Sequence, residues 1–167
     1  TNPKTLSCVE SLIGTDILLM ASHFFCKYGP QHQFVGWHQD VTYFGLEPPE
    51  AVAVWYAIDD SDRENSCMRV IPRTHHGPLR EHGKSDKDGN LLNLNQEVPL
   101  SAAEKENAVD IELKSGTASF HHGHVIHGSG PNHSTRRRCG LACVYLPAQI
   151  RQTELNARGE YWSVVLL

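Results

Sequence analysis

Apolar residues recur along the chain in short continuous or alternating runs separated by polar turns rich in Gly, Pro, Asn and Asp. Runs of roughly four to eight residues are typical of strands. They predict strands over 16–27, 34–38, 51–58, 67–71, 109–113, 117–121, 124–127 and 138–146. Helical spacing predicts a short helix over 4–13, and Ser101 with Glu104 has the spacing of a capping box. So many short strands and so little helix predict an all-β antiparallel double-sheet barrel or sandwich.

The longest polar stretch covers about residues 73–96, and a shorter loop over 44–50 carries Pro48-Pro49. Polar segments of such length are more often functional lids or disordered insertions than packed elements. We expect both segments to shape the specificity of a binding pocket. Candidates for contact with an anionic substrate, if they are not simply solvated, are Arg73, His75, His76 and Arg80.

The chain has 167 residues with 15 basic and 19 acidic side chains and a net charge of -4, so one domain over 1–167 is expected. This charge does not suggest nucleic-acid or membrane partners. The five cysteines are odd in number and lack a CxxC motif, which favours small buried thiols in a reducing compartment. With no apolar stretch of about 20 residues, we expect a cytoplasmic protein. The first residue is Thr1 rather than Met, which is compatible with a piece of a longer protein.

Two potential metal ligands lie close together in Gly36-Trp37-His38-Gln39-Asp40, whose β-branched and aromatic surroundings predict a strand running into a loop. Side chains at positions i and i+2 of a strand share a face, so His38 and Asp40 are expected side by side. Two histidines and one carboxylate form the facial triad that holds iron(II) and leaves positions open for co-substrate and oxygen. A His-x-Asp alone also occurs by chance, so a third ligand is needed.

That ligand is expected in the stretch 121–138, which carries five of the eleven histidines. His127 is predicted to end a strand just before Gly-Ser-Gly-Pro, and the chain then returns as a strand that begins at Arg138. A buried guanidinium needs an anionic partner, and its planar donors suit the far carboxylate of a metal-chelating keto acid. The alternative is that Arg138 is only the last residue of a solvated basic turn.

Four strings, SHFFCK, GWHQDVTYFGLEPPEAVAVW, NSCMRVIPRTHH and HHGHVIHGSGPNHSTRRR, resemble the phytanoyl-CoA dioxygenase family of iron(II)- and 2-oxoglutarate-dependent oxygenases. The resemblance runs from about residue 16 to residue 146. It implies an all-β core folded as a double-stranded β-helix (jelly roll, cupin-like) with a few peripheral short helices. Much of the family's N-terminal helical region is absent from the chain.

The resemblance also implies the roles of individual residues. The metal triad of the family falls on His38, Asp40 and His127, and the arginine that binds the distal carboxylate of 2-oxoglutarate falls on Arg138. Further co-substrate contacts implied in this way are Ser129, Trp55, His23 and Lys27. Histidines that match no ligand position, and for which a structural or surface role is expected, are His121, His122, His124 and His133.

Two departures from the family pattern each replace a glycine. The chain has Asn65-Ser66-Cys67 where relatives commonly have Asn-Gly-Cys, and Pro72-Arg73-Thr74-His75 where they have Pro-Gly-Ser-His. Glycine is the residue that adopts left-handed backbone conformations at no steric cost, so altered turns near the site mouth are expected.

The function implied by the resemblance is hydroxylation of a small molecule, with conversion of 2-oxoglutarate and O2 to succinate and CO2. Asp40 favours hydroxylation, because halogenating relatives carry a small residue in place of this carboxylate. One alternative is a non-catalytic or degenerate metal-binding protein of the same fold. A second is a cupin-like enzyme without a keto acid, which leaves Arg138 unexplained. The sequence does not identify the substrate, because proteins that share a fold can act on different substrates.

Overall fold

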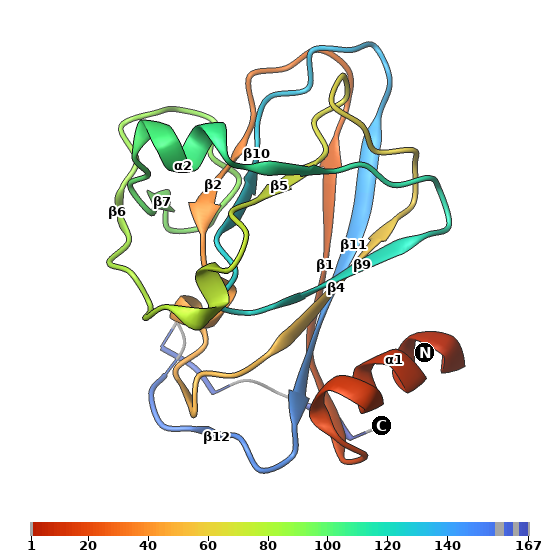
Figure 1. Ribbon diagram of the computed structural model, residues 1–167, viewed down its shortest axis with the longest axis vertical. Coiled ribbons are helices and arrows are strands. Elements are labelled where there is room, and N and C mark those ends of the chain that lie inside the picture. The colour runs from red at the N-terminus through yellow and green to blue at the C-terminus, as the bar shows by residue number, and fades with distance from the viewer. Residues whose placement is uncertain (1, 156–158, 162–163, 167) are drawn as a thin grey trace.

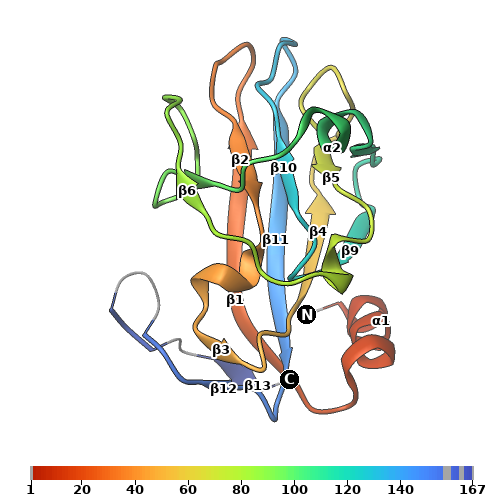
Figure 2. The same cartoon turned by 60° about the vertical axis from the view of Figure 1, so that its left-hand side comes forward.

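The chain forms two antiparallel β-sheets that face each other across a cavity. This computed structural model describes residues 2–155, 159–161 and 164–166. Figures 1 and 2 show the longer sheet, in the order β13-β1-β11-β4-β9, with the shorter sheet β2-β10-β5-β8 lying over it. The all-β core expected from the sequence is confirmed, and helix is confined to short peripheral pieces.

The longer sheet is built around one strand pair, β1 (Ile17–Lys27) with β11 (Arg138–Pro147). Their register runs from Ile17 opposite Pro147 to Lys27 opposite Arg138, with one irregularity between Leu19 and Ala21. The sheet is completed by β4 (Val52–Ala57), β9 (Ala118–His122) and β13 (Val165–Leu166). A pairing of this length fixes which residue ends each strand, and thereby brings Lys27 next to Arg138.

Strand β4 reads as one continuous apolar run because both of its faces are covered. Val52 and Val54 belong to an apolar cluster that includes Val9 of helix α1 (Pro3–Ile13), which packs on the outer face of the sheet. Ala53 and Trp55 alternate with them and line the cavity between the sheets. The alternation of a strand therefore separates the structural face from the face that forms the site.

The shorter sheet consists of β2 (Val35–His38), β10 (His127–Ser129), β5 (Met68–Val70) and β8 (Val109–Ile111). Two details differ from the predicted elements. His127 begins its strand rather than ends it, because a turn at 123–124 and a bend at 125 separate it from the preceding strand. Asp40 lies outside β2, as the first residue of a 3-10 helix (Asp40–Tyr43) that follows the extended residue Gln39.

The polar segment 73–96 is not a disordered insertion but is bonded to strand β2. The backbone amide of Gly36 donates to Asn90 Oδ1 at 3.0 Å, and that of Phe34 donates to Gly89 O at 3.0 Å. The segment holds a 3-10 helix (Thr74–His76) and β6 (Gly83–Lys84), which pairs with β7 (Gln96–Glu97). These hydrogen bonds attach the segment to the strand that carries His38 and to the residue just before it.

The remaining elements agree with the sequence patterns. Helix α2 (Ala102–Glu106) begins with the predicted capping box of Ser101 and Glu104. Strand β3 (Leu46–Glu47), within the loop 44–50, pairs with β12 (Arg151–Gln152). All five cysteines are free. Neither helix in the described part of the chain has the length and apolar character that a membrane crossing requires.

Candidate metal centre

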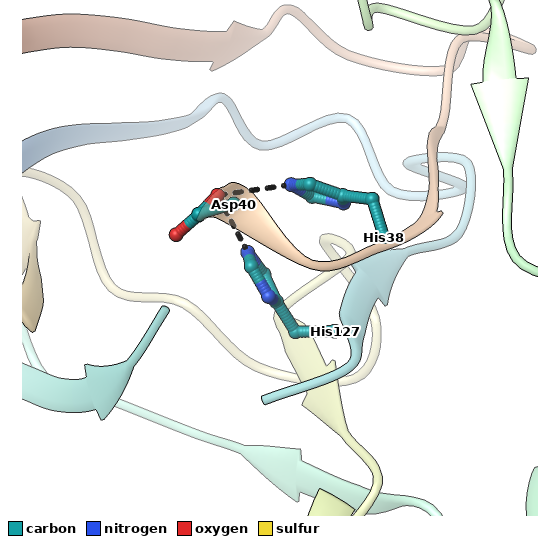
Figure 3. Close-up of side chains that lie close together, drawn as sticks. All are labelled: His38, Asp40 and His127. Carbon is teal, nitrogen blue, oxygen red and sulfur yellow. Dashed lines mark ion pairs between the residues drawn. The ribbon is translucent and has the colours of Figure 1, made fainter. Parts of the chain in front are cut away.

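Two histidines and an aspartate meet where β2 and β10 lie side by side (Figure 3). His38 and His127 occupy directly paired positions of these antiparallel strands, and their ring centroids are 4.2 Å apart. Asp40 Oδ1 lies 3.3 Å from His38 Nε2 and 3.7 Å from His127 Nε2. Ligand atoms bound to one ion at about 2.1 Å are about 3.0–3.4 Å apart, so these three atoms need little movement to share a metal. The structure thus brings together the three residues proposed as ligands.

The backbone fixes the tautomer of both histidines. His38 Nδ1 donates to Gly36 O at 2.9 Å, and His127 Nδ1 donates to Val125 O at 2.9 Å. With the proton on Nδ1, the lone pair of each Nε2 points toward Asp40. Such support from a carbonyl is usual behind metal-ligating histidines, because it sets ring orientation and raises basicity.

The protonation states at neutral pH are those that a cation requires. Burial favours the neutral form of Asp40, but the neighbouring histidines outweigh it and hold the pKa of this carboxyl well below its usual range. Burial, together with the nearby His38, lowers the pKa of His127 to about 3. An ionised carboxylate beside a neutral imidazole can bind a metal without first losing protons.

The three residues open into a cavity of about 250 Å³ between the sheets. Its walls are mainly apolar and come from both sheets, including Phe25, Ala53, Trp55, Ala142 and Val144. Residues 92–94 of the polar segment and Phe44 of the adjoining loop also line it. Both segments therefore contribute to the wall of the cavity, and their effect on specificity stays a prediction.

Arg138 lies in the same cavity and is nearly inaccessible to solvent, with 2% of the residue exposed. One of its terminal nitrogens donates to Ser129 Oγ at 3.1 Å, and its Cζ lies 5.5 Å from the centroid of the Trp55 ring. Its Nε is buried with no hydrogen-bond partner among the described residues. Burial lowers the pKa of this guanidinium to about 10, so it still carries a charge at neutral pH.

The alternative reading of Arg138 as part of a solvated basic turn does not hold. The two arginines before it do lie at the surface, where Arg136 pairs with Asp62 at 2.8 Å and Arg137 pairs with Asp59 at 2.8 Å. Arg138 begins strand β11 and points inward, and no carboxylate in the described ranges pairs with it. Its charge is therefore available to pair with an anion that enters the cavity.

Lys27 is a second buried basic side chain beside Arg138. Its Nζ donates to Ser129 Oγ at 2.7 Å and to Ser66 Oγ at 2.8 Å, and it also contacts Gly130 O. Burial and the charge of Arg138 lower the pKa of Lys27 to about 6. Ser129 therefore connects the two basic side chains, one from each of the paired strands β1 and β11.

Both residues that replace family glycines adopt a glycine-like backbone conformation. The φ angle is 74° at Ser66 and 67° at Arg73, which is the left-handed region that other residues rarely enter. The altered turns expected from the sequence therefore do not occur at these two residues. The hydroxyl of Ser66 adds a contact that glycine cannot make, since it accepts from Lys27 and donates to Gly130 O.

The remaining candidate residues are not part of the cluster formed by His38, Asp40 and His127. His23 is exposed at the edge of the cavity. Arg80 pairs with Glu104 at 2.6 Å, so its charge is already compensated. Arg73 and His75 line a separate cavity of about 310 Å³ rather than the cavity into which His38, Asp40 and His127 open. His121 matches no ligand position of the family, yet its ring lies 4.5 Å from that of His127 and lines both cavities.

The double-sheet core and the cluster of His38, Asp40 and His127 agree with the resemblance noted in the sequence. The chain belongs to the phytanoyl-CoA dioxygenase (PhyH) family, whose model matches residues 1–140. It is 30% identical over 165 residues to the peroxisomal phytanoyl-CoA dioxygenase of Bos taurus. The alignment covers 96% of this chain and 48% of that protein. The chain thus spans about half the length of the curated relatives it matches.

Solved structures agree with the jelly-roll assignment. The non-heme monooxygenase ThoJ, in its apo form, is 29% identical with a TM-score of 0.79, over 99% of this chain and 58% of that one. EvdO2 of Micromonospora carbonacea var. aurantiaca, complexed with 2-oxoglutarate, is 20% identical with a TM-score of 0.75, over 96% of this chain and 67% of that one. At that identity the second likeness shows the fold alone.

Proposed function

We propose that the chain carries the active site of an iron(II)- and 2-oxoglutarate-dependent dioxygenase that hydroxylates a small molecule. The observation that carries this proposal is the buried, uncompensated Arg138, which shares one cavity with His38, Asp40 and His127. A dicarboxylate that chelates a metal through one end and pairs with a guanidinium through the other fits this arrangement. A cupin-like enzyme without a keto acid leaves the arginine without a partner.

The residues present fit both groups. His38, Asp40 and His127 would hold iron(II), since two nitrogen ligands and one carboxylate in this order leave the cavity side open. Arg138, Ser129 and Lys27 would bind the distal carboxylate of 2-oxoglutarate, and the Trp55 ring would form a wall beside it. When bound, iron(II) and 2-oxoglutarate supply the activation of O2, with the balance substrate–H plus 2-oxoglutarate plus O2 giving substrate–OH plus succinate plus CO2.

The protein contributes to this chemistry by positioning the reacting groups and excluding water, rather than by acid or base catalysis. The apolar walls of the cavity keep water from the reacting groups. The carboxylate of Asp40 occupies the place that a halide would need, which supports hydroxylation over halogenation. The exposed His23, at the cavity edge, is the weakest of the proposed co-substrate contacts.

The partner proposed for this site is a small-molecule substrate, and its identity is left to experiment. The cytoplasmic location expected from the sequence stays a proposal. The competing proposal, a non-catalytic member of the fold, rests on two features of the sequence, the largely absent N-terminal helical region and the replaced glycines. Because Ser66 and Arg73 keep left-handed φ angles, nothing at these turns argues against an intact site.

Turnover without substrate distinguishes the two proposals. The purified chain is incubated with iron(II), 2-oxoglutarate, ascorbate and O2, and succinate is measured. We expect slow, iron-dependent formation of succinate that is lost in Asp40→Ala and retained in His133→Ala, a matched histidine variant away from the cavity. Formation of succinate at the same rate in both variants would contradict the assignment of the site.

A further inference from the structure

His121 faces the candidate metal centre although it is not one of the three proposed ligands. It lies on β9 directly opposite Ala53 of β4. Both residues line the cavity into which His38, Asp40 and His127 open, which we call the metal cavity. Its Nε2 lies 3.5 Å from Asp40 Oδ2, the carboxylate oxygen that faces away from the two ligand histidines. Asp40 is therefore approached from two sides, with its Oδ1 toward His38 and His127 and its Oδ2 toward His121.

The environment of His121 differs from that of the two ligand histidines. The Nδ1 atoms of His38 and His127 each donate to a backbone carbonyl at 2.9 Å. Both ring nitrogens of His121 are buried with no hydrogen-bond partner in the described part of the chain, and 9% of its side chain is exposed. Its tautomer is thus not fixed by the backbone, so Nε2 is free to carry the proton.

A buried histidine with two unsatisfied nitrogens is costly, because each orphaned polar atom loses about 1–3 kcal/mol of hydration. An anionic oxygen that lies 3.5 Å away is within reach of a small rotation of either side chain. His121 is also outside the group of atoms that lie mutually within 4.8 Å, which contains only His38, Asp40 and His127 among the described residues. A role as donor therefore fits the geometry better than a role as fourth ligand.

We propose that His121 is a positioning residue that donates from Nε2 to Oδ2 of Asp40 and so presents Oδ1 alone to the metal. This inference rests on the proposed function, because it concerns the same site. A carboxylate held at one oxygen binds through the other and leaves the remaining coordination positions open. Without the donor, Asp40 is free to turn and bind through both oxygens, which would occupy a position needed by the co-substrate or oxygen.

The test compares His121→Phe, which keeps a ring and removes both nitrogens, with His121→Gln, which keeps an amide donor. The control is His122→Phe, since the next residue of β9 does not line the metal cavity. Iron(II) affinity is measured anaerobically, and the visible charge-transfer band of the iron–2-oxoglutarate complex is recorded for each variant. Thermal unfolding without metal shows whether each variant is folded.

We expect His121→Phe to bind iron about 10- to 100-fold more weakly, in keeping with the loss of an outer partner of a metal ligand, and to shift the band. His121→Gln should recover most of the affinity and the wild-type band position, and His122→Phe should match the wild type. Wild-type affinity and band position in folded His121→Phe would overturn the inference. If His121→Phe does not fold, a His121→Gln variant with a weakened affinity and a displaced band would overturn it. Failure of the wild type itself to bind iron would instead overturn the proposed function.

Discussion

Lys27 and Arg138 are direct cross-strand partners in the pairing of β1 with β11, and both are buried, with 0% and 2% of each residue exposed. No carboxylate in the described ranges forms an ion pair with either side chain. Protonation of Lys27 would place a second buried positive charge beside Arg138, which destabilises a folded chain unless an anion accompanies the pair. A carboxylate bound in the cavity would pair with Arg138 and relieve this cost of protonating Lys27.

Replacing Lys27 with Met should flatten the dependence of stability on pH. Burial and Arg138 lower the pKa of Lys27 to about 6, whereas the unfolded lysine titrates near 10.5. Between these values the unfolded chain binds one more proton, so the unfolding free energy of the wild type rises with pH. The slope from this group is at most about 1.4 kcal/mol per pH unit.

Denaturant unfolding of the metal-free protein and of Lys27→Met, measured at several pH values between about 6 and 10, checks this expectation. The advantage of the Met variant should be largest near pH 6 and should shrink as the pH rises. Parallel curves for the two proteins would show that Lys27 is protonated in the folded state throughout.

Arg138 should confer the preference for a keto acid with a second carboxylate. In the wild type we expect 2-oxoglutarate to bind at least about 30-fold more tightly than 2-oxopentanoate, which has the same chain without that group, because a buried charge pair contributes about 2 kcal/mol or more. Arg138→Met should lose most of this ratio and keep its affinity for iron(II). Calorimetric titration of the iron-loaded proteins under argon gives both values. An unchanged ratio in the variant would exclude Arg138 as the anchor.

The two replaced glycines should respond differently to restoration. Arg73→Gly removes a side chain from a left-handed residue and should stabilise the protein by up to about 1 kcal/mol. Ser66→Gly relieves a similar strain but removes the oxygen that accepts from Lys27, so its gain should be smaller or reversed. Equilibrium unfolding of both variants provides the comparison. An equal gain in both would mean that the hydroxyl of Ser66 does not stabilise Lys27.

Gly140 should be required for the position of the Trp55 ring. A Cβ at this residue would overlap the indole, which packs beside Arg138 in the cavity. We expect Gly140→Ala to lose about 1–3 kcal/mol of stability, the usual cost of overpacking, and to weaken binding of 2-oxoglutarate. The double variant with Trp55→Leu should regain stability, since the smaller side chain leaves room for the methyl group. A single variant as stable as the wild type would contradict the close packing.

Local patterns in the sequence predicted much of the fold and the core of the site. The spacing of His38 and Asp40 placed them together even though Asp40 lies in a 3-10 helix rather than the strand, because the extended Gln39 preserves the alternation up to that point. The apolar run of β4 and the capping box of α2 likewise depend on near neighbours. Local patterns of this kind can be recognised in the sequence without knowledge of the tertiary structure.

Contacts set by strand register could not be predicted. Lys27 and Ser66 are 39 positions apart in the sequence, so no local pattern predicts their contact. The inward orientation of His121 follows from the pairing of β9 with β4, which assigns it to the face of Ala53. Sequence reasoning treated it as one more histidine in a rich stretch, since only the register distinguishes it from its neighbours.

The most direct test of the central claim is an anaerobic titration of the purified chain with iron(II) and 2-oxoglutarate, observed in the visible range. A charge-transfer band arises only when a 2-oxo acid chelates the metal, so it reports on the triad and the co-substrate pocket together. We expect the band to appear with saturable dependence on both components, and to be absent in Asp40→Ala. A folded wild-type chain that binds neither component, or binds iron(II) without developing the band, would contradict the assignment of this cavity as an iron and 2-oxoglutarate site.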